Sequence, residues 1–246
     1  MAFNTKKFPI DKDYIKKGNA RSGRLITKVG FIVAHDTGDS GATAQNEHDY
    51  FNNQQPSASA HTFIDDKVIK EIIPVDKPEK AWHVLYQKPT DNKMFGDDAN
   101  DIAIGVELCF GGKIDFSKAY EKYVWYLAYL CHKFGLKPDK HIVSHKILDP
   151  ERKIDPDNAL NRYGKTYKGL LADVLKEYNS GSQPVYPGVL KQGSTGADVK
   201  LVQKKLGIGA DGIFGSGTKR AVVAFQKEHD LVADGIIGKL TWNTLF

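Results

Sequence analysis

Three parts of the sequence place histidine or carboxylate side chains where they could do chemistry. In the first, His35 ends the short apolar run 30–34 (GFIVA), and residues 36–38 (DTG) turn the chain immediately afterwards. Strand ends are where α/β folds commonly place their sites. A single histidine at a strand end is more often structural than functional, so His35 alone leaves both interpretations open.

The second part is the segment HIVSHKILDPERKIDP. In it, His145 follows another predicted strand, and a loop then brings Lys153 and Asp155, separated by one residue. Two histidines and one carboxylate, with a fourth position left for water, are typical of a catalytic zinc site. His141 and His145 are four residues apart, but Ile142 stands where the helical H-E-x-x-H motif has its glutamate, which argues against that class of metalloprotease.

The third part is Glu107, which lies in the apolar run 102–110 (IAIGVELCF). A carboxylate in the middle of an apolar strand is costly unless it has a partner or a function. Glu107 could face water from an edge strand. Alternatively, it could be a general base beside a metal, its pKa raised by apolar surroundings and lowered by the nearby cation. The residues alone leave both interpretations open.

The elements that must position these residues alternate between strands and helices. Apolar runs predict strands at 30–34, 61–64, 68–73, 102–110 and 141–144. Helices are expected at about 43–53, 117–134 and 168–178. This order predicts an α/β fold, in which helices flank a mixed central sheet.

A change of pattern near residue 180 predicts a second domain. Residues 179–186 are small and polar with two prolines, which is typical of a short linker. We therefore expect a catalytic domain at 1–178 and a small three-helix domain at 187–246.

The predicted small domain contains an internal near-repeat. The sequence DGIFGSGT, which begins at Asp211, is echoed by DGIIGKLT 23 residues later. The glycines suit tight turns with positive φ. Ser216 or Thr218 in the first copy, and Thr241 in the second, could cap the helix that follows.

Five motifs in order carry a resemblance to a known family. They are HDTG at 35–38, SAH at 59–61, AWH at 81–83, IGVE at 104–107 and the segment 145–156. Together they resemble the type 2 N-acetylmuramoyl-L-alanine amidases over about residues 25–178. That family includes phage endolysins, bacterial autolysins and zinc amidases related to peptidoglycan-recognition proteins. The motifs LKQGSTGADVKLVQ, DGIFG, AFQ and DGIIG resemble the peptidoglycan-binding type 1 domain across nearly all of 187–246.

The resemblance implies roles for the chemistry-bearing residues. His35, His145 and Asp155 fall on the ligands of Zn²⁺, the third of which is cysteine in some members and aspartate in others. Glu107 falls on the catalytic acidic residue and Lys153 on a conserved-motif lysine.

Other motif residues flank the cleft of that family. His61, Trp82 and His83 are therefore expected as possible substrate contacts, and a structural role is as well supported for Trp82.

The implied function is a peptidoglycan hydrolase that cleaves the amide between N-acetylmuramic acid and L-alanine of the stem peptide. A phage or prophage endolysin and an autolysin both fit, and the C-terminal domain would hold the enzyme on the wall. One alternative is a non-catalytic peptidoglycan receptor on the same fold, although this chain fills all three ligand positions and that of Glu107. Another is a cytosolic amidase acting on small fragments, which would need no wall-binding domain.

Composition and charge limit the classes of partner that this chain is expected to bind. The net charge of +5 favours polyanions, but no nucleic-acid motif accompanies it, so we expect no nucleic-acid partner. No apolar stretch is long enough to span a bilayer, and we expect no membrane partner and a monomer.

Cysteine usage and the N-terminus bear on where the protein is made. Cys109 and Cys131 are expected to be buried free thiols, which fits an intracellular origin. No apolar segment of a signal peptide follows the lysines near Met1. We therefore expect synthesis in the cytoplasm and action on the cell wall after release or export.

Overall fold

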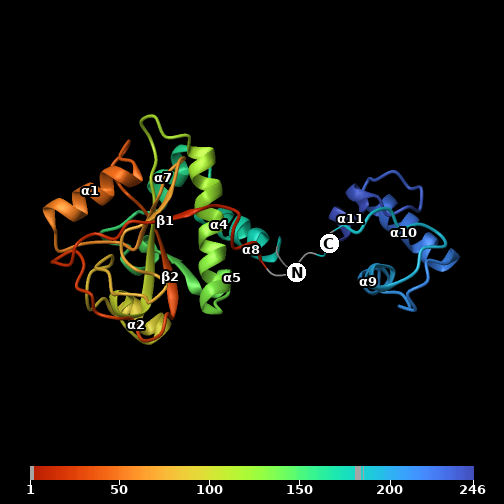
Figure 1. The fold of residues 1–246 in the computed structure, drawn as a ribbon, viewed down its shortest axis with the longest axis horizontal. Coiled ribbons are helices and arrows are strands. Elements are labelled where there is room, and N and C mark those ends of the chain that lie inside the picture. The colour runs from red at the N-terminus through yellow and green to blue at the C-terminus, as the bar shows by residue number, and fades with distance from the viewer. Residues whose placement is uncertain (1–2, 181–183, 185) are drawn as a thin grey trace. The chain divides into compact units, whose positions relative to one another are not determined.

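The computed structural model describes residues 3–180, 184 and 186–246. The chain divides near residue 181 into two compact units, each with its own apolar core (Figure 1). Of the linker predicted at 179–186, residues 181–183 and 185 lie outside the described residues. Its first two residues belong to a helix that continues to Ser180.

The N-terminal unit is built on a mixed six-stranded sheet, as predicted. Its strand order is β1-β4-β3-β5-β2-β6, and only the β3–β4 pair is antiparallel. The strands are β1 (Ile10–Lys12), β2 (Phe31–Asp36), β3 (Thr62–Ile64), β4 (Ile69–Glu71), β5 (Ala103–Leu108) and β6 (Ile142–Ser144). Because β5, β2 and β6 are parallel neighbours, their carboxyl ends meet at one edge of the sheet.

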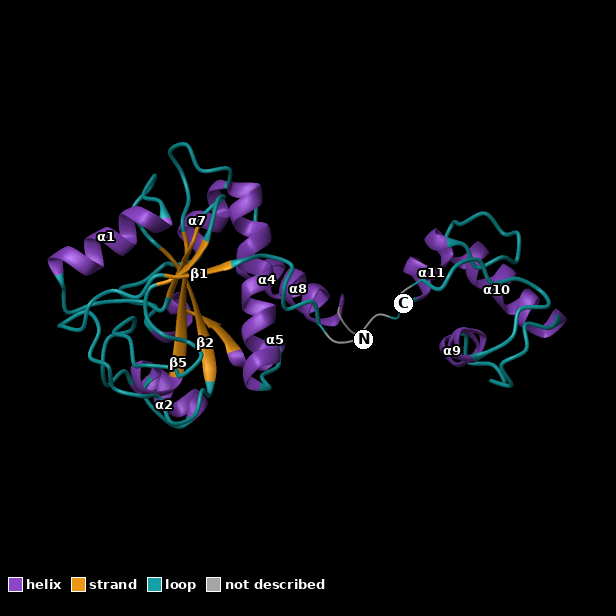
Figure 2. Ribbon diagram, in the orientation of Figure 1, coloured by secondary structure: helices purple, strands orange, loops and turns teal. Residues whose placement is uncertain are grey.

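Helices flank this sheet, and Figure 2 shows the long helix α4 packed along one side of it. The helices of the unit are α1 (Ala44–Gln54), α2 (Pro89–Phe95), α3 (Ala99–Ile102), α4 (Phe116–Phe134), α5 (Pro138–His141), α6 (His145–Leu148), α7 (Asp157–Arg162) and α8 (Tyr167–Ser180). The three predicted helices correspond to α1, α4 and α8. Strand β1 and the shorter helices were not predicted, because they have too few residues to show a hydrophobic periodicity.

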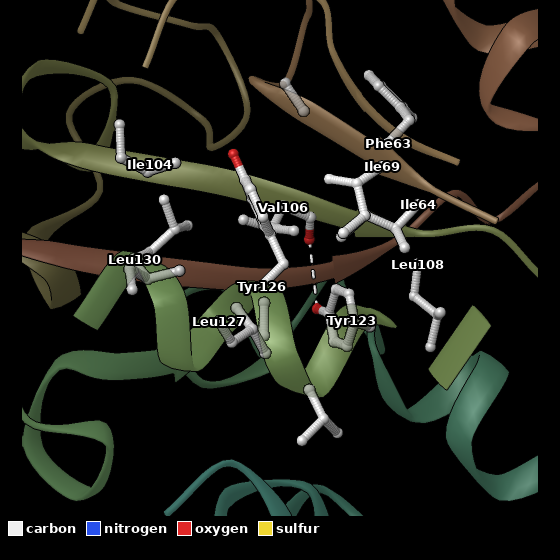
Figure 3. Close-up of a cluster of buried hydrophobic side chains, with 14 of the residues drawn as sticks. Phe63, Ile64, Ile69, Ile104, Val106, Leu108, Tyr123, Tyr126, Leu127 and Leu130 are labelled. Carbon is white, nitrogen blue, oxygen red and sulfur yellow. Dashed lines mark hydrogen bonds between the residues drawn. The ribbon is translucent and has the colours of Figure 1, made fainter. Parts of the chain in front are cut away.

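Side-chain alternation along the strands decides which residues reach the site. Ala34 on β2 and Ile104 and Val106 on β5 lie in the core that packs against α4, the latter two seen in Figure 3. Successive residues of a strand point to opposite faces. His35 and Glu107 therefore point to the face away from α4.

Helix α4 also fixes the backbone beneath the site. The buried Tyr123 hydroxyl donates to the carbonyl oxygen of His35 at 3.0 Å and to that of Val106 at 3.3 Å, the latter drawn in Figure 3. One phenol thus ties two neighbouring strands to the helix that covers them.

The C-terminal unit contains three helices in its described residues, as predicted. These are α9 (Ala197–Lys205), α10 (Ser216–Glu228) and α11 (Lys239–Leu245). They enclose a small core of Val199, Val202, Phe214, Val222, Ile237, Trp242 and Leu245.

The predicted helix caps in this unit are wrong. Gly215 and Gly238 are the N-caps of α10 and α11, and no side chain caps either helix. The Thr218 and Thr241 hydroxyls instead accept hydrogen bonds from glutamine amides 15 residues earlier in the chain. A local cap pattern cannot reveal so distant a donor.

The glycine turns of the near-repeat follow the prediction in part. Gly212 and Gly235 have φ of +81° and +73°, as a tight turn requires, whereas Gly215 and Gly238 have negative φ. Only the first glycine of each pair therefore meets the expectation of positive φ.

Both cysteines match the prediction. Cys109 and Cys131 are buried free thiols, and burial raises the pKa of Cys131 to about 12. In the described part of the chain, no helix has both the length and the apolar character needed to cross a membrane.

Candidate metal centre and cleft

Three adjacent parallel strands carry the candidate residues to one edge of the sheet. Glu107 on β5 is the register partner of His35 on β2. Ala34 pairs with Ser144 on β6, and His145 follows Ser144 directly. The order β5-β2-β6 therefore sets Glu107, His35 and His145 side by side.

His35, His145 and Asp155 bring their ligand atoms together. The Nδ1 atoms of His35 and His145 lie 2.9 Å and 3.0 Å from Asp155 Oδ2, and all three side chains are buried. These three residues could hold a metal ion, since their ligand atoms lie within 4.8 Å of one another. The loop that carries Asp155 is anchored by a backbone hydrogen bond: the Lys146 amide donates to the Asp155 carbonyl oxygen at 3.0 Å.

The protonation states of this cluster suit a cation. Burial lowers the pKa of His35 to about 4, so its imidazole is neutral near pH 7. Burial alone would raise the pKa of Asp155, but hydrogen bonds with His145 and His35 outweigh it and lower that pKa. Metal ligands must be neutral imidazoles and ionised carboxylates. The cluster therefore offers His35 and Asp155 in the forms that bind metal.

Glu107 lies beside this cluster without a hydrogen-bonding partner on one oxygen. Its Oε2 is buried and unpaired in the described structure. Burial raises its pKa well above the ordinary range, with further contributions from Asp155 and Asp36. The interpretation of Glu107 as an edge-strand residue facing water is wrong, because β5 lies between β3 and β2.

These residues open onto a cavity of about 510 Å³, which we call the cleft. Seven of the eight candidate residues line it: His35, Trp82, His83, Glu107, His145, Lys153 and Asp155. The structure thus brings all the candidates except His61 to one place.

Lys153 reaches the cleft from the loop after α6. Its backbone amide donates to the Asp149 carbonyl oxygen at 2.9 Å, which fixes the start of this loop. No carboxylate in the described residues pairs with the Lys153 ammonium, and the side chain lines the cleft. Its charge is therefore available to whatever occupies the cleft.

Arg152 is a second cleft cation that the sequence analysis missed. Its Nε donates to Asp149 Oδ2 at 2.6 Å, and Lys88 Nζ lies 2.7 Å from the other oxygen of this fully buried carboxylate. Asp149 thus holds two cations, of which Arg152 lines the cleft. Arg152 could have been found from the sequence, because it directly precedes the candidate residue Lys153.

His83 contacts a candidate metal ligand. His35 Nε2 lies 3.1 Å from His83 Nδ1, and His83 is buried. Partners of the second ring nitrogen of a histidine ligand orient the ring, and His83 is placed to do so for His35. The ring fits because position 105 is glycine: a Cβ on Gly105 would lie 2.6 Å from His83 Cγ. This explains the glycine of the IGVE motif.

His61 does not fit the expected substrate contact. It is fully buried, its Nε2 donates to the Glu79 carbonyl oxygen at 2.7 Å, and its Nδ1 accepts from the Gly105 amide at 3.0 Å. With both ring nitrogens engaged inside the protein, His61 has a structural role.

Asp36 is another residue that the sequence analysis missed. Its Oδ2 accepts from the Ala159 amide at 2.8 Å, and its Oδ1 accepts from Gly38 at 3.1 Å and from Asn158 at 3.3 Å. These bonds hold the start of α7, and with it the nearby Asp155, against the end of β2. Asp36 could have been found from the sequence, because its carboxylate directly follows the strand-end residue His35.

Both units of the chain match known protein families. Residues 26–158, more than half of the chain, match the family model described as N-acetylmuramoyl-L-alanine amidase. The chain belongs to this amidase family. Residues 195–245 match a model for a peptidoglycan binding domain, and this part of the amidase contains α9, α10 and α11.

Curated relatives extend over nearly the whole amidase. It is 32% identical to the N-acetylmuramoyl-L-alanine amidase CwlL of Bacillus licheniformis, a match that covers 96% of this chain and 71% of CwlL. It is 29% identical to CwlH of Bacillus subtilis (strain 168), over 91% of this chain and 92% of CwlH.

Solved structures share the fold of the catalytic unit. The catalytic domain of XlyA is 25% identical, with a TM-score of 0.55 and coverage of 68% of this chain and 99% of that domain. The hydrolase AmiA of Staphylococcus aureus, 22% identical with a TM-score of 0.59 over 73% of this chain and 88% of AmiA, shows the same fold. The amidase therefore has the mixed-sheet architecture of these enzymes.

Proposed function

We propose that this amidase uses a zinc ion to hydrolyse the amide between N-acetylmuramic acid and L-alanine in peptidoglycan, while its C-terminal domain holds it on the wall. The observation that carries the proposal is the convergence of His35, His145 and Asp155 beside Glu107 and Lys153 in one cleft.

The donor set favours zinc over other common cations. Two imidazole nitrogens and one carboxylate are a typical catalytic zinc set, whereas Mg²⁺ and Ca²⁺ prefer oxygen ligands alone. A bound zinc would supply a Lewis acid that activates water and polarises the substrate carbonyl. The ligand residues His35, His145 and Asp155 would hold it.

Glu107 is proposed as the proton carrier. The attacking water must lose a proton as its oxygen bonds to the lactyl carbonyl carbon, and the L-alanine nitrogen must gain one as the C–N bond breaks. A carboxylate at the cleft floor with an unpaired oxygen can accept the first proton and deliver the second. Burial raises its pKa, and this makes the ionised carboxylate a stronger base for the first of these transfers.

Lys153 is proposed to stabilise negative charge on the carbonyl oxygen. An ammonium aimed at developing charge acts more strongly in a site that excludes water. The lack of a carboxylate partner for Lys153 among the described residues leaves its charge for this task.

The filled donor set also favours an enzyme over a non-catalytic receptor. A receptor needs neither a metal set with compatible protonation states nor a buried unpaired carboxylate next to it. The peptidoglycan binding domain favours the insoluble wall over small soluble fragments as substrate, since a tether raises the effective concentration only of a fixed partner. The monomeric state, the lack of nucleic-acid and membrane partners, and action after release or export stay predictions.

Metal exchange tests the zinc assignment. Purified protein is treated with a chelator, dialysed and assayed on soluble muropeptides by release of free stem peptide. We expect activity to vanish on chelation and to return with one equivalent of Zn²⁺, but not with Mg²⁺ or Ca²⁺. Full activity in protein shown to be metal-free would contradict the proposal.

A further inference from the structure

The C-terminal unit contains a buried hydrogen-bond network centred on a glutamine. The Gln203 amide nitrogen donates to Asp211 Oδ1 at 2.7 Å, to the Ile213 carbonyl oxygen at 3.0 Å and to Thr218 Oγ1 at 3.0 Å. Its amide oxygen accepts from the Gly212 amide at 2.8 Å. The side chain of Gln203 thereby fixes the turn that leads into α10.

The same network recurs 23 positions later in the chain. Gln226 donates to Asp234 Oδ1 at 2.9 Å, to the Ile236 carbonyl oxygen at 3.0 Å and to Thr241 Oγ1 at 3.2 Å, and it accepts from Gly235 at 2.9 Å. Every partner has its counterpart in the first copy. The two copies are therefore one structural unit used twice, and differences between them are informative.

The copies differ in the residues beside the turn. A cavity of about 250 Å³ opens beside the first copy, and Gly209 and Gly217 form part of its wall. A Cβ added at either glycine would meet no atom within 4 Å, so the space next to both is open. In the second copy the equivalent positions hold Val232 and Leu240, whose side chains are 80% and 68% exposed. The first copy alone leaves these two positions without side chains.

The walls of this cavity indicate what it would bind. Ile208 and Ile213 supply apolar surface, and Ile213 is 56% exposed. Asp211 is the charged side chain among the lining residues, and no lysine or arginine lines this cavity. Backbone donation from Ile213 and the bond from Gln203 lower the pKa of Asp211, and its Oδ2 accepts no hydrogen bond from the described residues. An alkyl chain that ends in an ammonium group matches these walls.

We propose that this cavity is the wall-binding site of the C-terminal domain and that it takes a primary amine on an alkyl chain. Peptidoglycan presents such a group where the diamino residue of a stem peptide is not cross-linked. The alkyl chain packs between Ile208 and Ile213, and the ammonium pairs with Asp211. The second copy has lost the site and keeps only the structural turn. This assignment rests on the proposed role of the domain as a wall anchor.

Copying the residues of the second repeat into the first tests the site. In the full-length chain, Gly217→Leu and Gly209→Val add side chains at the wall of the cavity. Neither glycine has a left-handed φ, and a Cβ at either meets no atom within 4 Å, so we expect both variants to fold. Co-sedimentation with purified, amidase-resistant walls measures Kd. We expect each variant to bind about tenfold or more weakly, a loss of roughly 1.4 kcal/mol or more. The matched controls Val232→Gly and Leu240→Gly change the second copy and should bind as the original chain does.

A second arm identifies the ligand chemistry. Acetylating the free amines of the walls removes their positive charge, and we expect the original chain then to bind as weakly as the Gly217→Leu variant. Normal binding by Gly217→Leu, at an unchanged melting temperature, would overturn the site. Normal binding to acetylated walls would overturn the amine assignment and point to glycan instead. If the original chain hydrolyses soluble muropeptides but never sediments with walls, the anchor role itself fails.

Discussion

Replacing Glu107 with glutamine is expected to lower the rate of muropeptide hydrolysis by on the order of 10²–10⁴-fold. Glutamine keeps the shape of the side chain and its place on β5, but it cannot accept the proton of the attacking water or deliver one to the L-alanine nitrogen. The measurement is kcat on a soluble muropeptide with the zinc content of each sample held equal. Substrate binding should change much less, since the geometry of the cleft is kept.

The same substitution should leave stability intact or raise it. Glu107 has a buried, unpaired oxygen, and in the metal-free protein its ionisation near pH 7 costs free energy because burial raises its folded pKa. We therefore expect an equal or higher melting temperature for the metal-free variant. Glu47→Gln is a matched control, since Glu47 lines a neighbouring cavity and burial raises its pKa to about 7. Wild-type turnover by Glu107→Gln would remove Glu107 from the mechanism.

Replacing Asp155 with alanine is expected to abolish both metal binding and activity. The Nδ1 atoms of His35 and His145 converge on Asp155 Oδ2, so alanine removes the third ligand and the acceptor that orients both rings. Loss of a ligand should cost more than the 10–100-fold in affinity typical of residues that only support ligands. Metal content after dialysis, measured by inductively coupled plasma mass spectrometry, should fall from stoichiometric to near background.

Two further variants separate this role from general destabilisation. Asp155→Cys should retain zinc, because cysteine is the third ligand in some amidases that this chain resembles. Asp157→Ala removes a nearby carboxylate that pairs with Lys146 outside the cleft, and it should keep both zinc and activity. Stoichiometric zinc in Asp155→Ala would exclude Asp155 from the ligand set.

The sequence predicted the strands that carry most of the candidate site residues. His35 and Glu107 lie at equivalent positions of neighbouring parallel strands. The apolar runs predicted both strands but not their pairing, and only the family resemblance placed the two residues in one site. The same logic applies to His145, which follows β6. Asp155 lies on a loop, and the sequence placed a carboxylate there without showing that it reaches the two histidines. Its position depends on the Lys146 amide and on the bonds of Asp36 to α7, which no local pattern reveals.

The roles of the two buried histidines His61 and His83 were harder to predict. His61 and His83 occupy similar motifs, yet one bonds the Glu79 carbonyl and the Gly105 amide inside the protein and the other contacts His35. The difference depends on the partners that each ring meets and on the missing side chain at Gly105, which leaves room for His83. These contacts join residues that are far apart in the sequence, so the spacing of motifs does not predict them.

Mass spectrometry of digested peptidoglycan tests most directly whether this protein cuts the amide between N-acetylmuramic acid and L-alanine. Purified walls are incubated with the protein, with and without a zinc chelator, and the soluble products are sequenced. We expect free stem peptides with a new L-alanine N-terminus, absent on chelation and restored by zinc. Products cut elsewhere, or walls left intact by zinc-loaded protein that still sediments with them, would contradict it.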